Sequence, residues 1–210
     1  MKNLIKEACV GNLEEAINAE KQGADRLELC AELHLGGTTP SEELILQAKQ
    51  QLHIPLRIMI RPRGGDFVYT EEELQEMRAS IEFCKSAGVE AVVFGILDKE
   101  NQLDLPRISE LARLAQPLKV VIHKAIDLTP DPLEAAKQLC RIEEIDTILT
   151  SGGQPTAFEG REVLQRMIDS CGEKQEIMPG GKVSSANLEE LHGLLGAKAY
   201  HGKLIVGNLD

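Results

Sequence analysis

The stretch PLRIMIRPRGGDFVYTEEELQEMRASIEFCKSAG, residues 55–88, contains one complete structural unit. Its first six residues form a mostly apolar run, as expected of a strand buried in a parallel sheet. A polar, glycine-rich loop follows, and a helical pattern continues from Thr70, a residue suited to cap a helix N-terminus, to Gly88. The stretch therefore predicts a strand, a loop and a helix in that order, which is the repeating unit of α/β folds.

The same alternation of apolar runs and helical patterns fills the chain of 210 residues. The other apolar runs are 4–10, 26–30, 91–95, 119–123, 147–150, 176–178 and 199–201. Helices are expected over 13–22, 158–171 and 185–195, and from about positions 41, 106 and 132 onward. Eight strands and seven helices predict a (β/α)8 TIM-type barrel with the eighth helix missing. No linker-like segment divides the chain, so we expect a single domain over residues 1–210.

The composition is that of a soluble globular protein and excludes several classes of function. Hydrophobic residues make up 42% of the chain and charged residues 27%, and no apolar stretch is long enough to span a membrane. The formal charge of −11 argues against general binding to nucleic acid or to anionic membranes. Acidic residues come too early for a secretion signal, and the five scattered cysteines are typical of reduced thiols. We therefore expect a cytoplasmic protein.

Polar side chains gather where the predicted strands end, and this end of a barrel carries the active site. Alternation along the strands places Glu7, Glu28 and Arg61 on the inner face, with His123 near enough to join them. Carboxylates beside a guanidinium would compensate one another, because unpaired buried charge is costly. These four residues and Asp127 are our catalytic candidates for proton transfer. The alternative is a buried ion network that only fixes the strands.

Each of the first two strands ends in a Glu-X-Cys unit, which places Cys9 and Cys30 on the inner face. Adjacent strands lie about 4.8 Å apart, so the two thiols can approach one another if the strand registers match. Two close thiolates are suited to a soft ion such as Cu(I). The alternative is that both are small buried residues without a ligand, as free cysteines often are. The other three cysteines lie in helical segments, and we expect them to be structural.

Glycine-rich turns follow the last strands, in the segments PGGK at 179–182 and HGK at 201–203. Barrels that bind phosphorylated ligands often use the loops after strands seven and eight, where backbone N–H groups face the ligand. We therefore expect an anion site at this end of the barrel. Its expected members are Arg63, Ser151, Gly152, Gly180, Gly181 and Lys182. Alternatively, the glycines are turn residues only.

Only nine residues follow position 201, too few for an ordinary eighth helix. Leu204, Ile205 and Val206 would then form part of an exposed apolar patch over the last strand. The simplest cover for that patch is a second copy of the chain. We therefore expect a homodimer or a higher homo-oligomer, with the C-terminal tail near its interface.

Several segments carry a family resemblance that extends over essentially the whole chain. They are EACV at 7–10, GADRLELC at 23–30, GGTTPS at 36–41, MIRPRGGDFVYTEEEL at 59–74, VVFGIL at 92–97, IHKAID at 122–127, LTSGG at 149–153, MPGG at 178–181 and YHGK at 200–203. With these segments the sequence resembles the CutC family, named for copper homeostasis. The resemblance implies a (β/α)8 barrel, a cytoplasmic protein, self-association and a link to copper. It also implies Cys9 and Cys30 as the Cu(I) ligands.

Two functions stay open at this point. In the first, the chain handles copper, and Cu(I) is the ion bound by the two cysteines. In the second, it is an enzyme of unassigned reaction that acts on a small anionic or phosphorylated metabolite. The residues at the strand ends favour the enzyme, whereas the family resemblance favours copper.

Overall fold

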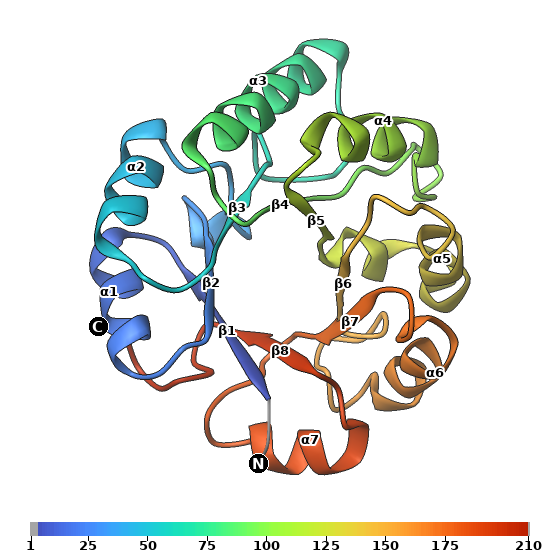
Figure 1. Cartoon of the computed structure of the whole chain (residues 1–210). Coiled ribbons are helices and arrows are strands. Elements are labelled where there is room, and N and C mark those ends of the chain that lie inside the picture. The colour runs from blue at the N-terminus through green and yellow to red at the C-terminus, as the bar shows by residue number, and fades with distance from the viewer. Residues whose placement is uncertain (1–3, 210) are drawn as a thin grey trace.

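The computed structural model describes residues 4–209, which form a barrel of eight parallel strands surrounded by helices (Figure 1). The strands are β1 Ile5–Val10, β2 Arg26–Leu29, β3 Leu56–Met59, β4 Ala91–Phe94, β5 Lys119–Ile122, β6 Thr147–Thr150, β7 Glu176–Pro179 and β8 Ala199–Gly202. The α-helices are α1 Leu13–Lys21, α2 Glu42–Gln51, α3 Glu71–Ala87, α4 Leu105–Ala115, α5 Pro132–Leu139, α6 Arg161–Cys171 and α7 Leu188–Leu195. Two short 3-10 helices, η1 Leu33–Leu35 and η2 Lys124–Leu128, follow β2 and β5. The predicted (β/α)8 barrel is confirmed.

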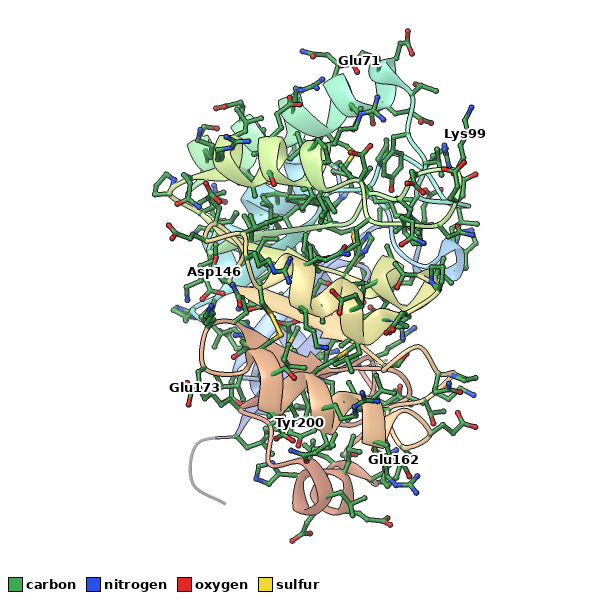
Figure 2. The ribbon with its side chains drawn as sticks, turned by 90° about the vertical axis from the view of Figure 1, so that its right-hand side faces the viewer. Glu71, Lys99, Asp146, Glu162, Glu173 and Tyr200 are labelled. Carbon is green, nitrogen blue, oxygen red and sulfur yellow. A yellow bond between two sulfur atoms is a disulfide. The ribbon has the colours of Figure 1, made fainter. Side chains whose placement is uncertain are left out.

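The strands pair in chain order from β1 to β7, and β8 pairs with β1. β7 and β8 lie side by side where the ring closes (Figure 1). All strands therefore begin at one end of the barrel and finish at the other. Figure 2 shows the barrel from the side, with Asp146 and Glu173 near the end where strands begin and Lys99 and Glu162 near the end where they finish. We call the second end the mouth.

The helix after β3 shows how the sequence sets the boundaries of these elements. The Thr70 hydroxyl accepts a hydrogen bond from the Glu73 N–H at 3.3 Å, and the Glu73 carboxylate accepts one from the Thr70 N–H at 2.8 Å. This reciprocal capping box satisfies two N–H groups that have no partner within the helix. The predicted cap is thereby confirmed. None of the helices within residues 4–209 is long and apolar enough to cross a lipid bilayer.

Two apolar layers follow from the alternation of side chains along the strands. Leu27, Leu29 and Ile58 belong to the large layer between the strands and the helices. Cys30 and Met59 belong to a smaller layer inside the barrel, with side chains from five other strands. The predicted facing of β2 and β3 is therefore confirmed. The inner layer is thin, so polar side chains occupy much of the barrel interior.

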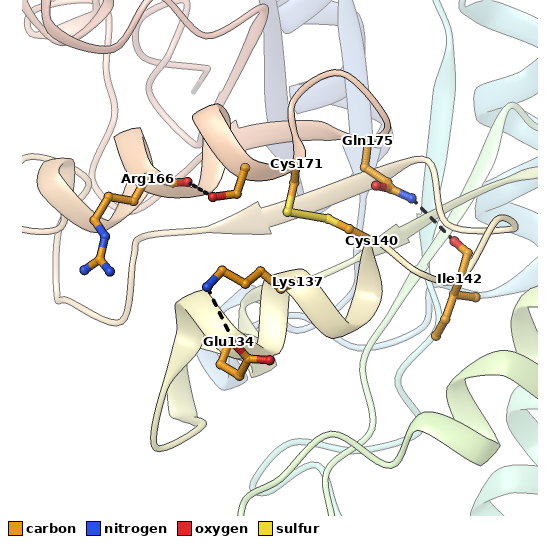
Figure 3. The surroundings of a disulfide bond; sticks show 8 residues. Glu134, Lys137, Cys140, Ile142, Arg166, Cys171 and Gln175 are labelled. Carbon is orange, nitrogen blue, oxygen red and sulfur yellow. Dashed lines mark hydrogen bonds and ion pairs between the residues drawn. A yellow bond between two sulfur atoms is a disulfide. The ribbon is translucent and has the colours of Figure 1, made fainter.

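A disulfide between Cys140 and Cys171 joins the C-terminal ends of α5 and α6 (Figure 3). Their Cα atoms are 6.1 Å apart, a separation that a disulfide spans. The expectation that all five cysteines are reduced is therefore wrong for this pair, whereas Cys9, Cys30 and Cys84 are free thiols. Helices that follow one another around the barrel pack side by side, which brings together two cysteines 31 residues apart. Spacing in the sequence does not reveal such a pair.

The expected exposed seam after β8 is wrong for Ile205, which is buried, whereas Leu204 is exposed as expected. No helix follows β8 within the described residues, but the C-terminal tail folds back onto α1 (Figure 1). Ile205 and Leu209 are buried, and the side chain of Asn18 donates a hydrogen bond to the Leu209 carbonyl at 3.0 Å. The chain covers its own last strand, so the tail no longer supports self-association. The homo-oligomer stays a prediction.

Replacing Ile205 by alanine should lower the free energy of unfolding by about 2–5 kcal/mol, because the change leaves a cavity beneath the tail. Leu204→Ala is the matched control, since Leu204 is 47% exposed. The control should change the free energy by less than about 0.5 kcal/mol. Urea denaturation of both variants measures the difference. Equal effects of the two substitutions would show that the tail does not pack as described.

Candidate functional site

Three neighbouring strands bring the predicted inner residues of β1 and β2 together with a residue of β8. In the paired strands, Cys9 lies opposite Glu28, and Glu7 lies opposite His201. Cys30 follows the end of β2, where its N–H donates to the Val10 carbonyl at 2.9 Å. These five side chains form a buried group inside the barrel, which we call the β8–β1–β2 cluster. It contains thiols, carboxylates and an imidazole, all of which can bind metal ions.

The two thiols of this cluster lie close together, as the sequence analysis required for a shared site. The sulfur atoms of Cys9 and Cys30 and a carboxylate oxygen of Glu28 all lie within 4.8 Å of one another. The Cys30 thiol also donates a weak hydrogen bond to Glu28 at 3.6 Å. The hydrogen bond from Cys30 lowers the pKa of Cys9, whereas that same bond and burial raise the pKa of Cys30. Cys9 is therefore the thiol that ionises first.

The Glu7 carboxylate has three positively charged or proton-donating neighbours. Its Oε2 atom pairs with the Arg26 Nε and with the Arg57 Nη1, the latter at 3.3 Å. Its Oε1 atom lies 2.9 Å from the His201 Nδ1. Burial raises the pKa of Glu7, but the His201 hydrogen bond and the two guanidinium charges outweigh burial and lower the pKa to about 2. Glu7 is therefore an ionised, fully paired carboxylate.

Arg61 does not pair with Glu7 or Glu28, so the predicted ion group is wrong in this respect. Arg57 and Arg61 both face inward from β3 and its extension, but Arg57 is the residue that lies opposite Glu28. Arg61 lies four residues further toward the mouth, where its guanidinium donates to the carbonyls of Leu35, Gly37 and Gly65. Alternation along a strand gives the face of a residue but not its level along the barrel axis.

Sequence reasoning missed the roles of Arg26, Arg57 and His201. The alternation that places Glu28 and Met59 on the inner face also places Arg26 and Arg57 there, because each arginine stands two positions earlier on the same strand. His201 stands at the end of β8, where its Nε2 lies 3.7 Å from a Glu28 oxygen. Burial lowers the pKa of His201, but its acidic neighbours outweigh burial and raise it. Burial raises the pKa of Glu28 to about 8 despite the neighbouring His201 charge.

His123 lies apart from the cluster, so the expectation that it joins Glu7 and Glu28 is also wrong. The residue follows β5, and its imidazole packs against the Phe67 ring with the centroids 4.9 Å apart. Its Nδ1 accepts a hydrogen bond from the Ala125 N–H at 3.2 Å. Burial and the charge of Arg61 lower the pKa of His123 to about 4.

Asp127 organises the loop after β6. Its carboxylate accepts hydrogen bonds from the N–H groups of Ser151 and Gly153 and from the Thr150 hydroxyl. Lys124 pairs with the same carboxylate at 2.8 Å. Burial raises the pKa of Asp127, but Lys124 and the hydrogen bonds outweigh burial and lower the pKa. Its oxygen atoms are largely occupied by contacts that shape the mouth.

The predicted anion site is only partly assembled. The N–H of Gly152 donates to the Thr150 hydroxyl and that of Gly180 donates to the Thr150 carbonyl, both at 2.9 Å, so neither is free for an anion. Arg63 pairs with Glu73 and Asp66. Lys182 has a left-handed backbone with φ 55°.

A different lysine approaches the glycine turn after β7. A Cβ atom added to Gly181 would lie 3.5 Å from the Lys124 Nζ and 3.0 Å from the Ser151 Cβ. Lys124 also donates to the Ser151 hydroxyl. The positive group that the structure places beside Ser151 and Gly181 is therefore Lys124. An anion site with Lys182 stays a prediction.

The other end of the barrel is hollow and charged. A cavity of about 410 Å³ opens there, among side chains at the beginnings of the strands. Arg26 and Arg57 line it and reach from it to Glu7. Glu176 pairs with Arg26 at 2.9 Å, and Glu90 pairs with Arg57 at 3.1 Å. The charges that hold Glu7 are therefore themselves balanced at the rim of this cavity.

Replacing Arg57 by methionine should lower the free energy of unfolding by about 3–5 kcal/mol, because it removes one partner of a buried carboxylate. Arg78→Met is the matched control, since Arg78 pairs with the exposed carboxylates of Glu71 and Glu110. That change should cost no more than about 1 kcal/mol. Urea denaturation near neutral pH compares the two variants. An Arg57→Met protein as stable as the control would contradict the ion group described here.

Glu28 should make the stability of the protein depend on pH. Its pKa is about 8 in the folded state against 4.5 for an unperturbed carboxyl group. The folded state therefore keeps a proton that the unfolded state loses, and the free energy of unfolding should fall as pH rises from about 4.5 to about 8. Glu28→Gln should flatten this fall, because its amide does not titrate. An unchanged slope in denaturation experiments across this interval would contradict the assignment.

With this geometry established, the comparisons with known proteins agree with one another. The profile of the CutC family matches residues 4–206. The human protein named copper homeostasis protein cutC homolog is 39% identical over 197 residues, which are 94% of this chain and 72% of the human protein. A CutC family protein from Parabacteroides distasonis is 41% identical over 202 residues, 96% of this chain and 82% of that protein. A crystal structure of a CutC protein from Streptococcus agalactiae has a TM-score of 0.90 and 34% identity, and the match covers 96% of this chain and 99% of that chain. The chain therefore belongs to the CutC family.

Proposed function

We propose that the chain binds Cu(I) through Cys9 and Cys30 and acts in copper homeostasis. The observation that carries this proposal is the meeting of two free thiols and the Glu28 carboxylate within 4.8 Å inside the barrel. The copper homeostasis name of the human relative supports the choice of metal.

The donor set favours a soft monovalent ion over harder ions. Thiolates select Cu(I), whereas carboxylate and carbonyl oxygens select ions such as Mg²⁺ and Ca²⁺. The lowered pKa of Cys9 favours the thiolate that such an ion needs. Cys30 keeps its proton until the ion displaces it, since burial and the bond to Cys9 hold its pKa high. Cu(I) binding should therefore release at least one proton and strengthen as the pH rises.

The surroundings of the thiols suit retention of the ion. Cys30 is 1% exposed and Cys9 is only partly exposed, so the ion would be largely shielded from water. His201 lies next to Glu28 and carries a positive charge when protonated, which would balance the negative charge of two thiolates. A shielded dithiolate site with a nearby compensating charge fits a protein that holds copper.

The test is stoichiometric Cu(I) binding, measured anaerobically in competition with a chromophoric Cu(I) chelator. The wild-type protein should bind one Cu(I) per chain at this site. Cys9→Ser and Cys30→Ser should each abolish that binding, because one thiolate is too few donors for a retained Cu(I) ion.

Two control proteins make the result specific. Cys84→Ser removes a buried free thiol on α3, and a Cys140→Ser, Cys171→Ser double variant removes the disulfide pair. Both should keep the stoichiometric ion. Equal losses in all variants, or no loss from Cys9→Ser or Cys30→Ser, would exclude a shared site at this pair.

A further inference from the structure

Arg61 carries a buried positive charge that has no counter-ion within the described part of the chain. The residue is 4% exposed, and its Nη atoms donate to three backbone carbonyls of neighbouring loops. No carboxylate of residues 4–209 lies within 4.0 Å of its guanidinium. Its Nε is buried and has no hydrogen-bond partner. A buried charge of this kind is costly unless an anion compensates it.

His123 provides a second buried donor without an acceptor. Its Nδ1 accepts the Ala125 N–H, so the proton of the neutral ring is on Nε2. That Nε2 is buried and has no hydrogen-bond partner. Gly95 leaves room for the ring, since a Cβ atom there would lie 2.7 Å from it. The lowered pKa of His123 keeps the ring neutral at physiological pH, so it donates a hydrogen bond without adding a charge.

One aromatic ring connects these two donors. The Arg61 guanidinium lies over the Phe67 ring at 4.6 Å, and the His123 ring lies 4.9 Å from the same ring. The Tyr69 hydroxyl is a third buried group without a partner, and burial raises its pKa to about 12, so it keeps its proton. Water can satisfy N–H and O–H donors, but it cannot neutralise the Arg61 charge. The unpartnered donors of Arg61, His123 and Tyr69 therefore suit a ligand that combines acceptor atoms with one negative charge.

We propose that the Arg61, Phe67 and His123 side chains form a site for the carboxylate of a small organic acid. One carboxylate neutralises Arg61 and accepts hydrogen bonds from the Arg61 Nε–H and the His123 Nε2–H. The Phe67 ring supplies an apolar wall beside it. In a 2-oxo acid the His123 Nε2–H can donate instead to the carbonyl oxygen next to the carboxylate and polarise it, which would make such an acid a suitable ligand.

This carboxylate site is separate from the proposed copper site. Its residues come from the ends of β3 and β5 and the loop after β3, whereas the β8–β1–β2 cluster comes from the next strands around the ring, since β3 pairs with β2 (Figure 1). No residue is shared between the two sites. The carboxylate proposal therefore holds or fails independently of copper.

The test uses pyruvate and acetate as probes and acetamide as a neutral analogue of acetate. Nitrogen NMR of the wild-type imidazoles should show His123 protonated at Nε2, and pyruvate should shift this resonance in a saturable manner. Acetate should shift it more weakly, because it offers only the carboxylate, and acetamide should have no saturable effect. The same shifts should occur in Cys9→Ser, which lacks the proposed copper site.

Variants locate the site through the rise in Tm that a bound ligand causes. Arg61→Lys keeps the charge but loses the Nε–H donor, so it should bind pyruvate roughly tenfold or more weakly. His123→Phe keeps the ring packing and should also lose the rise. Arg63→Lys is the control, since Arg63 is already paired with Glu73 and Asp66. It should respond as the wild type does.

Three results would overturn the proposal. The first is an imidazole protonated at Nδ1 in the wild type, and the second is an equal response to acetate and acetamide or no response to either carboxylate. The third is an equal loss in Arg61→Lys and Arg63→Lys. The wild-type NMR result decides the matter even if His123→Phe fails to fold.

Discussion

A single buried carboxylate, that of Glu7, pairs with Arg26 and Arg57 and accepts a hydrogen bond from His201. These partners come from β2, β3 and β8, so one side chain of β1 fixes three other strands. A slip of one residue in any of them would turn its charged side chain toward the apolar layer outside the barrel. The cost of an unpaired buried charge therefore specifies the strand registers. Those same registers bring Cys9, Cys30 and Glu28 together.

The architecture and the facing of side chains could be predicted from the sequence because they depend on local periodicity. The apolar run of β3 and the Thr70 cap are examples of such local signals. The level of each side chain along the barrel axis depends instead on the registers between strands. For this reason Arg61 was expected beside Glu7, although Arg57 occupies that place. The Cys140–Cys171 disulfide and the folded tail depend on contacts between distant segments, for which the sequence offers no periodic signal.

Different strands of the barrel bring different functional groups into its interior. On the side of β8, β1 and β2, charges are balanced within the protein, and the groups left for a ligand are the two thiols and one Glu28 oxygen that has no hydrogen-bond partner. On the side of β3 and β5, the groups left over are the N–H donors of Arg61 and His123. Between these sides, Asp127 is occupied by the backbone of the loop after β6. This explains why residues that look alike in sequence, such as Glu28 and Asp127, have different surroundings in the barrel.

The Cys140–Cys171 disulfide has a consequence for the integrity of the chain. The covalent ring that it closes includes β6, α6 and the exposed loop around Gln154 and Pro155. A protease that cuts this loop produces two fragments, but the disulfide still joins them. The two fragments stay covalently linked beside the mouth and can separate only after the disulfide is reduced. Cleavage in the exposed loop after β6 therefore breaks one peptide bond without releasing any segment of the chain.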